Sequence, residues 1–184
     1  TNQIAPGGTL ADFSDPVINQ VGQVAASASF TDNASFGMFV GDGSSTVAIA
    51  LGGQAAPKGG NYDRGFFTPH RLNDNGDVAF LVGLTGGGRR TGVYRGNGSQ
   101  TTTIAFTGAN APGTTGTFDS FRDFQILNDG RIALIATLTV GVGGVNTSNN
   151  MGIWIGTSDE DLQLVVRTGD VIDGRVLTRL PQFG

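Results

Sequence analysis

Apolar and polar residues alternate along several short segments of the chain, with the period of two that is typical of β-strands. The clearest segment covers residues 77–84. One face of that predicted strand carries Val78, Phe80, Val82 and Leu84. Residues 24–30 and 132–138 show the same alternation. Because the second face is also largely small or apolar in all three segments, we expect these strands to be covered on both sides.

A short turn sequence precedes each of these segments, and it is repeated along the chain. Asn19, Asn73 and Asn128 open the three copies and stand 54 and 55 residues apart. Each asparagine is followed by a glycine and then by an alanine on the strand. The signature positions are Asn19, Gly22 and Ala25; Asn73, Gly76, Ala79 and Phe80; and Asn128, Gly130 and Ala133. A period of this length indicates a repeat architecture.

The remainder of each unit repeats in the same order. A box with the pattern Gly-x-aromatic-x-Gly is followed by a β-rich run, a glycine turn and a phenylalanine that leads into the next unit. The boxes are residues 37–41, 92–96 and 152–156, the β-rich runs are residues 47–51, 101–106 and 162–167, and the phenylalanines are Phe13, Phe66 or Phe67, and Phe121. We therefore predict one repeat domain over residues 1–184, with units at about 9–57, 62–112 and 117–170 and a connecting or docking strand at 171–184.

The repeat predicts an all-β fold made of three four-stranded antiparallel sheets. Asparagine and glycine in the turns tolerate the positive φ that tight hairpins require. Helix is disfavoured, since the chain has 31 glycines but only one lysine and one glutamate. Four antiparallel strands in roughly 50 residues match a β-propeller blade, here in an incomplete ring or part of a larger assembly. A β-sandwich is the competing architecture, although its strands do not usually repeat in sequence at a four-strand period.

The signature also resembles that of a known protein family. Asn73, Gly76, Ala79 and Phe80 fit the pattern Asn-x-x-Gly-x-x-Ala-Phe of the tandem-repeat proteins named after that motif. The first copy has Ala26 in place of the phenylalanine, and the third copy is one residue shorter and has Leu134. The resemblance implies blade-like repeats in an exported bacterial protein, placed outside the cell or on its surface. It implies no particular activity.

Three blades are fewer than the four or so that close a propeller ring, so sheet faces and edges are expected to be left for association. Residues 1–8 resemble the end of a preceding unit, and residues 174–184 resemble the beginning of a following one. The C-terminal segment is also rich in apolar side chains. We expect it to dock as a strand on a neighbouring subunit through Val171, Ile172, Val176, Leu177, Leu180 and Phe183.

Composition narrows the range of functions. The formal net charge of −4 and the lack of a basic patch argue against nucleic-acid binding. Without cysteine the chain has no disulfide and no thiolate metal site, and no run of 18 apolar residues predicts a membrane span.

Candidate chemistry is sparse. His70, the single histidine, has no second histidine to complete a metal site or a nucleophilic triad, so a structural role is expected. The turn at residues 73–77 and the acidic cluster at 159–161 could be calcium loops, but solvated turns fit them better because neither has a full set of oxygen ligands. Phe39, Tyr94 and Trp154 share one repeat position and are expected to be core residues, with carbohydrate stacking as the alternative.

These observations predict a non-enzymatic extracellular structural or assembly protein, such as a component of a filament, sheath, matrix or complex. Its expected partners are other protein subunits or copies of itself, and no cofactor or metal is expected. The alternative is a propeller-type binding module for a glycan or peptide. Within the fold, Ala25, Ala79 and Ala133 are expected to be buried where neighbouring sheets approach closely.

Overall fold

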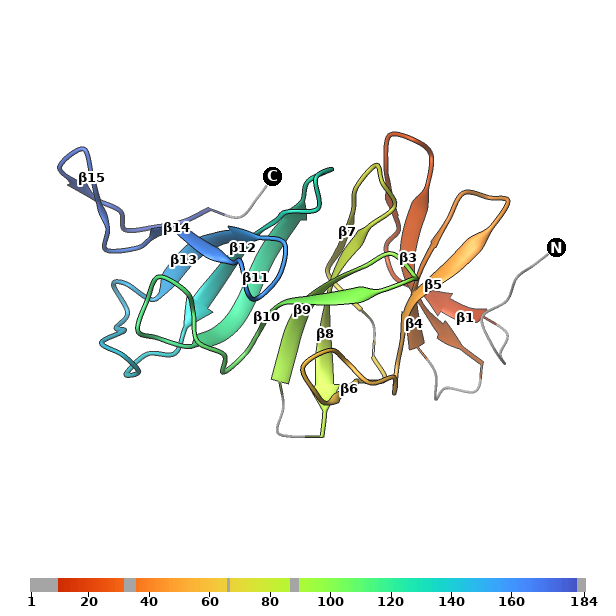
Figure 1. Cartoon of the computed structure of the whole chain (residues 1–184), viewed down its shortest axis with the longest axis horizontal. Coiled ribbons are helices and arrows are strands. Elements are labelled where there is room, and N and C mark those ends of the chain that lie inside the picture. The colour runs from red at the N-terminus through yellow and green to blue at the C-terminus, as the bar shows by residue number, and fades with distance from the viewer. Residues whose placement is uncertain (1–9, 32–35, 66, 87–89, 182–184) are drawn as a thin grey trace. The chain divides into compact units, whose positions relative to one another are not determined.

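The computed structural model describes residues 10–31, 36–65, 67–86 and 90–181 of the chain (Figure 1). Over these residues the regular structure is antiparallel β-sheet with no α-helix, which confirms the all-β prediction. The chain divides into two compact units, residues 1–103 and 104–184, and the division falls within one strand. Each unit is described by itself.

The first sheet belongs to the N-terminal unit and contains five strands. Its order is β1-β3-β4-β5, and the short strand β2 also pairs with β3. The strands are β1 (Leu10–Phe13), β2 (Val17–Ile18), β3 (Val24–Phe30), β4 (Phe36–Gly41) and β5 (Thr46–Leu51). Along β5 the register shifts, and Ile49 is the extra residue of a β-bulge.

The second sheet repeats this arrangement with the order β10-β9-β8-β6, and β7 also pairs with β8. The strands are β6 (Asn61–Tyr62), β7 (His70–Leu72), β8 (Val78–Thr85), β9 (Arg90–Gly96) and β10 (Thr101–Phe106). The strand predicted just before Asn73 is present as β7, and β6 is an additional short strand that pairs with the other end of β8, so the sheet has five strands and not the predicted four. Pro69 precedes β7 and has no amide hydrogen with which to continue the ladder.

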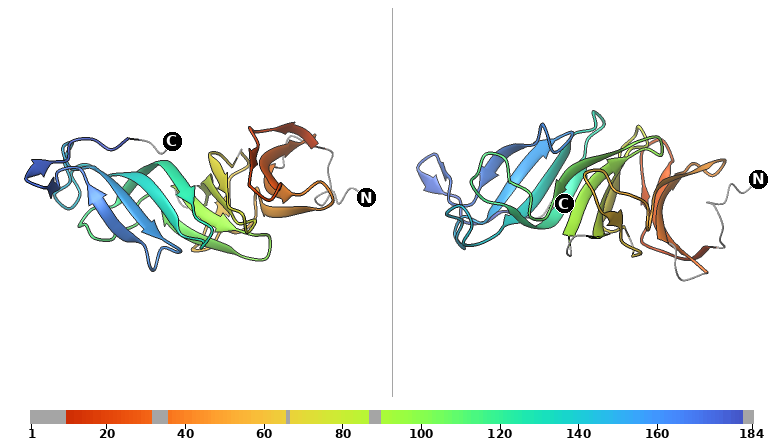
Figure 2. Two further views of the ribbon diagram at one scale, coloured as in Figure 1. Left: turned by 90° about the horizontal axis from the view of Figure 1, so that it is seen from above. Right: turned by 60° about the horizontal axis from the view of Figure 1, so that its bottom comes forward.

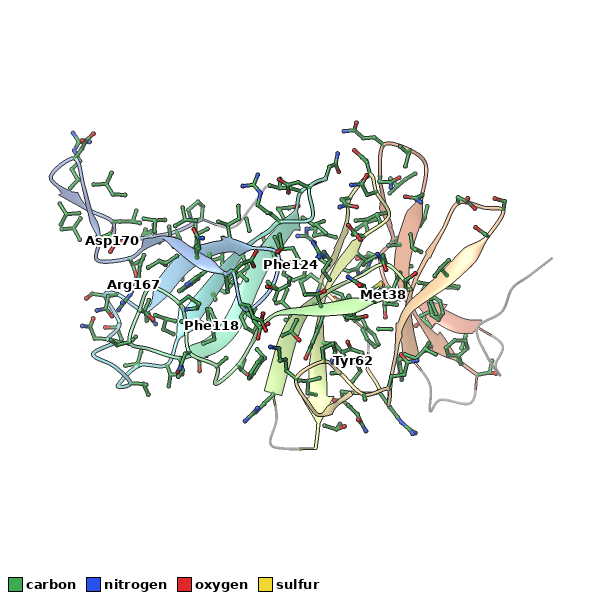
Figure 3. The ribbon with its side chains drawn as sticks, in the orientation of Figure 1. Met38, Tyr62, Phe118, Phe124, Arg167 and Asp170 are labelled. Atoms are coloured by element: carbon green, nitrogen blue, oxygen red, sulfur yellow. The ribbon has the colours of Figure 1, made fainter. Side chains whose placement is uncertain are left out.

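Side chains from both sheets form the core of the N-terminal unit. The first sheet contributes Ala25, Met38, Val40 and Ile49 and the second contributes Tyr62, Val78, Phe80, Val82, Leu84 and Tyr94, with Phe67 from the segment between β6 and β7. The Tyr62 ring lies edge-on to Phe67, Phe80 and Tyr94, with centroid distances of 5.8, 6.0 and 5.2 Å. Figure 3 labels Met38 and Tyr62, one from each side of this core.

The third sheet forms most of the C-terminal unit, in the order β11-β12-β13-β14. Its strands are β11 (Phe118–Ile126), β12 (Ile132–Leu138), β13 (Met151–Gly156) and β14 (Gln163–Arg167). Trp154 is fully buried, with its ring 5.0 Å from that of Phe118 and its Nε1–H donating to the Pro112 carbonyl at 2.9 Å.

A separate hairpin follows the third sheet and projects beyond it in both views of Figure 2. It consists of β15 (Val171–Ile172) and β16 (Arg175–Val176). The two turn residues, Asp173 and Gly174, both have positive φ, of 50° and 73°. A two-residue Asp-Gly loop with this geometry is a type I′ turn, which suits the right-handed twist of a hairpin.

In the described parts of both units, no helix has the length and apolar character needed to cross a membrane.

Candidate functional site

The signature asparagines fold their own turns. The Asn19 side chain accepts a hydrogen bond from the Gln23 amide at 2.8 Å, and Asn73 does the same for the Asp77 amide at 2.9 Å. The glycine of each turn has a φ of 81–84°, as at Gly22 and Gly76, which a residue with a side chain rarely adopts. The Asn-x-x-Gly pattern therefore specifies a tight connection into the following long strand.

Asn19 also links two sheets. Its side-chain amide donates to the Asn73 carbonyl at 2.9 Å, and the Gln20 amide donates to the Asp74 carboxylate at 2.9 Å. The Gln23 side chain lies against Gly76, where a Cβ would be 3.2 Å from its Nε2. The turns of the first and second sheets thus pack directly on each other.

Below the turns, the interface between these two sheets is apolar and includes a buried hydrogen bond. Ala25, Met38 and Ile49 lie on the face of the first sheet that we call the rear face. They pack against the face of the second sheet that carries Val78, Phe80 and Val82, which we call the front face. The Phe67 amide donates to the Ser27 hydroxyl at 3.0 Å within this contact.

The three signature alanines do not share one environment. Ala25 and Ala79 are fully buried, as expected. Ala133 is only half-buried, so the expectation that it too lies in a close approach between sheets is wrong. It occupies the rear face of the third sheet, where the described chain supplies less cover than it does for the first.

The clearest exposure on that rear face is at Val165. Ile49 and Val165 are the bulge residues of equivalent strands, each next to the register shift between the third and fourth strands. Ile49 is 6 % exposed, whereas Val165 is 59 % exposed. Ile153 and Ile155 are half-buried, although Met38 and Val40 at the equivalent positions are buried. The centre of the face is covered, since Ile135 is buried, and exposure is concentrated toward β14.

The C-terminal hairpin repeats a connection that occurs earlier in the chain. The Gly169 amide donates to the Leu177 carbonyl and the Leu177 amide to the Asp170 carbonyl, both at 2.8 Å. In the connection after the first sheet, the Gly53 amide likewise donates to the Tyr62 carbonyl at 2.8 Å. In the connection after the second sheet, the Gly108 amide donates to the Phe118 carbonyl at 2.7 Å. Leu177 therefore stands at the position of two buried aromatic residues.

The predicted assembly residues lie on and after this hairpin. Val171, Ile172 and Val176 are exposed, Leu177 and Leu180 are half-buried, and Phe183 lies outside the described residues. By the matched hydrogen bonds, Ile172 is equivalent to Ala56. Ala56 is 7 % exposed in the first copy, whereas Ile172 is 54 % exposed. Apolar area that is buried after the first sheet is thus exposed after the third.

The sequence did not reveal why each aromatic box begins with a glycine. In each box the aromatic ring lies over the glycine two residues earlier. A Cβ on Gly37, Gly92 or Gly152 would be 2.6, 2.5 or 2.6 Å from the ring of Phe39, Tyr94 or Trp154. Residues i and i+2 share one face of a strand, so the spacing itself was the available signal. Burial raises the pKa of Tyr94 to about 12, so this residue is neutral at ordinary pH.

His70 is buried. Its Nδ1 lies 3.2 Å from the Phe67 carbonyl, and Nε2 has no hydrogen-bond partner among the described residues. Burial lowers the pKa of His70, and the nearby Phe67 carbonyl partly opposes this effect. His70 also lines a depression of about 460 Å³ in the N-terminal unit, together with Phe13, Asp12, Asp15 and Arg71.

The acidic turns considered as calcium loops use their oxygens internally. Asp77 accepts from the Asn73 side chain at 3.3 Å. The Asp161 carboxylate accepts from the amides of Thr157 and Ser158 at 2.8 and 2.7 Å. Among the residues that the structure describes, no group of three or more His, Asp or Glu side chains could hold a metal ion.

Comparison with known proteins gives a family but no function. No curated protein and no solved structure matches the chain. One family model matches residues 2–178, and its description is a family of unknown function, DUF7453. The match covers nearly the whole sequence, and the chain therefore belongs to the DUF7453 family.

Proposed function

We propose that this protein is a non-enzymatic structural protein that works by assembly, with its three sheets acting as blades of a propeller-type array. The observation that carries this proposal is the contrast at matched positions of the repeat. Ile49 and Ile104 are 6 % and 0 % exposed, while Val165 at the same position of the third sheet is 59 % exposed. A repeat that leaves core positions exposed has apolar area available for another subunit.

The energetic scale supports association. Fully burying a side chain the size of valine or isoleucine stabilises by about 1.5–3 kcal/mol relative to exposure. Val165, Ile172 and the half-buried isoleucines of β13 together supply the apolar centre of an interface, although association also costs translational and side-chain entropy. An assembled state is therefore expected to be reversible and concentration-dependent.

The proposed location is outside the cell or on its surface. It rests on the resemblance to exported repeat proteins with the Asn-x-x-Gly-x-x-Ala-Phe motif, which Asn73, Gly76, Ala79 and Phe80 carry. Detection of the native protein in surface or secreted fractions of its own cells would support this location, and its confinement to the cytosol would contradict it.

Multi-angle light scattering over a range of protein concentrations tests assembly. The mass is expected to rise above that of the 18.9 kDa chain as concentration increases. A single species with the mass of one chain at every concentration up to the millimolar range would refute the proposal.

A glycan-binding role is the second candidate, and the depression beside His70 favours it. Phe13 is an exposed aromatic residue at this site, and Asp12, Asp15 and Arg71 supply polar groups that could contact sugar hydroxyls. Screening of a glycan array with the wild type and a Phe13→Ala variant tests it. Binding that the variant loses would support the second candidate, and an empty array would eliminate it for the sugars tested.

A further inference from the structure

The rear face of the third sheet has a counterpart whose occupant is known. In the N-terminal unit, the same face of the first sheet is covered by the front face of the second sheet. That contact combines an apolar centre of Ala25, Met38 and Ile49 with hydrogen bonds between the turns. The surface that fits a rear face is therefore a front face of another sheet of the same repeat.

The chain also carries a front face with exposed apolar residues, on the first sheet. Val24 and Ile18 pair across β2 and β3, and Phe13 pairs with Ala28 on the same side of the sheet. Ile18 is 71 % exposed, and Phe13 and Val24 are exposed as well. In the second and third sheets the equivalents of Val24 are Val78 and Ile132, and both are fully buried.

We propose that the rear face of the third sheet binds the front face of the first sheet of a second copy of this chain. The inference rests on the proposed assembly function and specifies the partner and the two surfaces. It continues an interface that already exists within the chain, with Val165 and Ile153 in the places of Ile49 and Met38. Because the two surfaces differ, the contact is heterologous and can add further copies in one direction.

The turns provide a polar contact in the expected place. In the existing interface, Gln23 of the rear-face sheet lies against Gly76 of its neighbour. Arg131 occupies the position of Gln23 in the third sheet and pairs with Asp129 at 2.7 Å. By the same repeat equivalence, Gly22 of the second copy takes the place of Gly76.

Two single variants and their mixture test the proposal. Val165→Asp places a charge on the rear face, and Ile18→Asp places one on the front face. Both positions are exposed in the chain itself, so folding should be preserved, and circular dichroism and Trp154 fluorescence check this. Val140→Asp, at an exposed valine in a loop, is the matched control.

The wild type and Val140→Asp should give a series of oligomers by light scattering, and each of the other two variants should raise the apparent Kd at least about tenfold. An equimolar mixture of Val165→Asp and Ile18→Asp should form a one-to-one dimer and nothing larger, because one intact pair of faces remains.

Failure of the assembly function and failure of this particular interface give different results. If the wild type stays a single chain, the assembly function and this interface both fail. If the wild type assembles and both aspartate variants assemble equally well, or if their mixture does not restore a dimer, the head-to-tail contact is overturned while assembly stands.

Discussion

Replacing Ala25 and Ala133 by leucine compares two copies of one signature position. Ala25 has no exposed surface, and its neighbours across the strands are Val17 and Val40. Leucine adds three carbon atoms to a site already packed against the second sheet. Overpacking of this kind typically costs about 1–3 kcal/mol. Ala133 is half-buried on the rear face of the third sheet, so leucine there should change the free energy of unfolding by less than about 0.5 kcal/mol.

Urea unfolding at low protein concentration, where copies do not associate, measures the difference. Circular dichroism follows the whole chain, and the fluorescence of Trp154, the single tryptophan, follows the C-terminal unit. Ala25→Leu should lower the midpoint, and Ala133→Leu should leave the tryptophan transition nearly unchanged. Equal losses in the two variants would show that Ala133 is as enclosed as Ala25 and would refute the reasoning about the exposed rear face.

Three further changes probe the turns, the boxes and the buried histidine. Asn19→Asp keeps the acceptor for the Gln23 backbone amide but removes the donor to the Asn73 carbonyl. It should lower the free energy of unfolding in urea by about 1–2 kcal/mol. Asn97→Asp, in an exposed turn, should lower it by less than about 0.5 kcal/mol. Gly152→Ala places a methyl group 2.6 Å from the Trp154 ring and should cost about 1–3 kcal/mol and shift the tryptophan emission, while Gly65→Ala, with open space around it, should do neither. Burial lowers the pKa of His70 below its ordinary value of 6.5, so the unfolded chain binds more protons than the folded one as pH falls through that value. Stability should therefore decrease from about pH 7 to pH 5, and His70→Gln should flatten this slope in urea midpoints measured at each pH, whereas parallel slopes would contradict the argument.

Much of the fold was accessible from local patterns. The alternation at Val78 to Leu84 and the repeated asparagine turns predicted the strands and their antiparallel order, because both depend on neighbouring residues only. The additional strand β6 was not predicted, because it depends on the course of the segment that leads into β7.

The sequence showed the apolar character of the C-terminal segment through its valine, isoleucine and leucine residues, but this segment was predicted as one docking strand and it forms the hairpin of β15 and β16. Exposure of Val165 and Ala133 was not visible in the sequence, because their sequence context is the same as that of the buried Ile49 and Ala25. Identical repeat positions differ only in whether a neighbouring sheet lies against them, which is a tertiary property.

The double role of Asn19 makes the stability of one repeat depend on that of the next. The same side chain closes its own turn through Oδ1 and holds the neighbouring turn through Nδ2. Unfolding of the second turn therefore removes a bond from the first, and loss of Asn19 affects both. Such nearest-neighbour coupling is the basis of linear cooperativity in repeat proteins. A substitution that destabilises one copy of the repeat should therefore also destabilise the neighbouring copy in the N-terminal unit, and should affect more distant parts of the chain less.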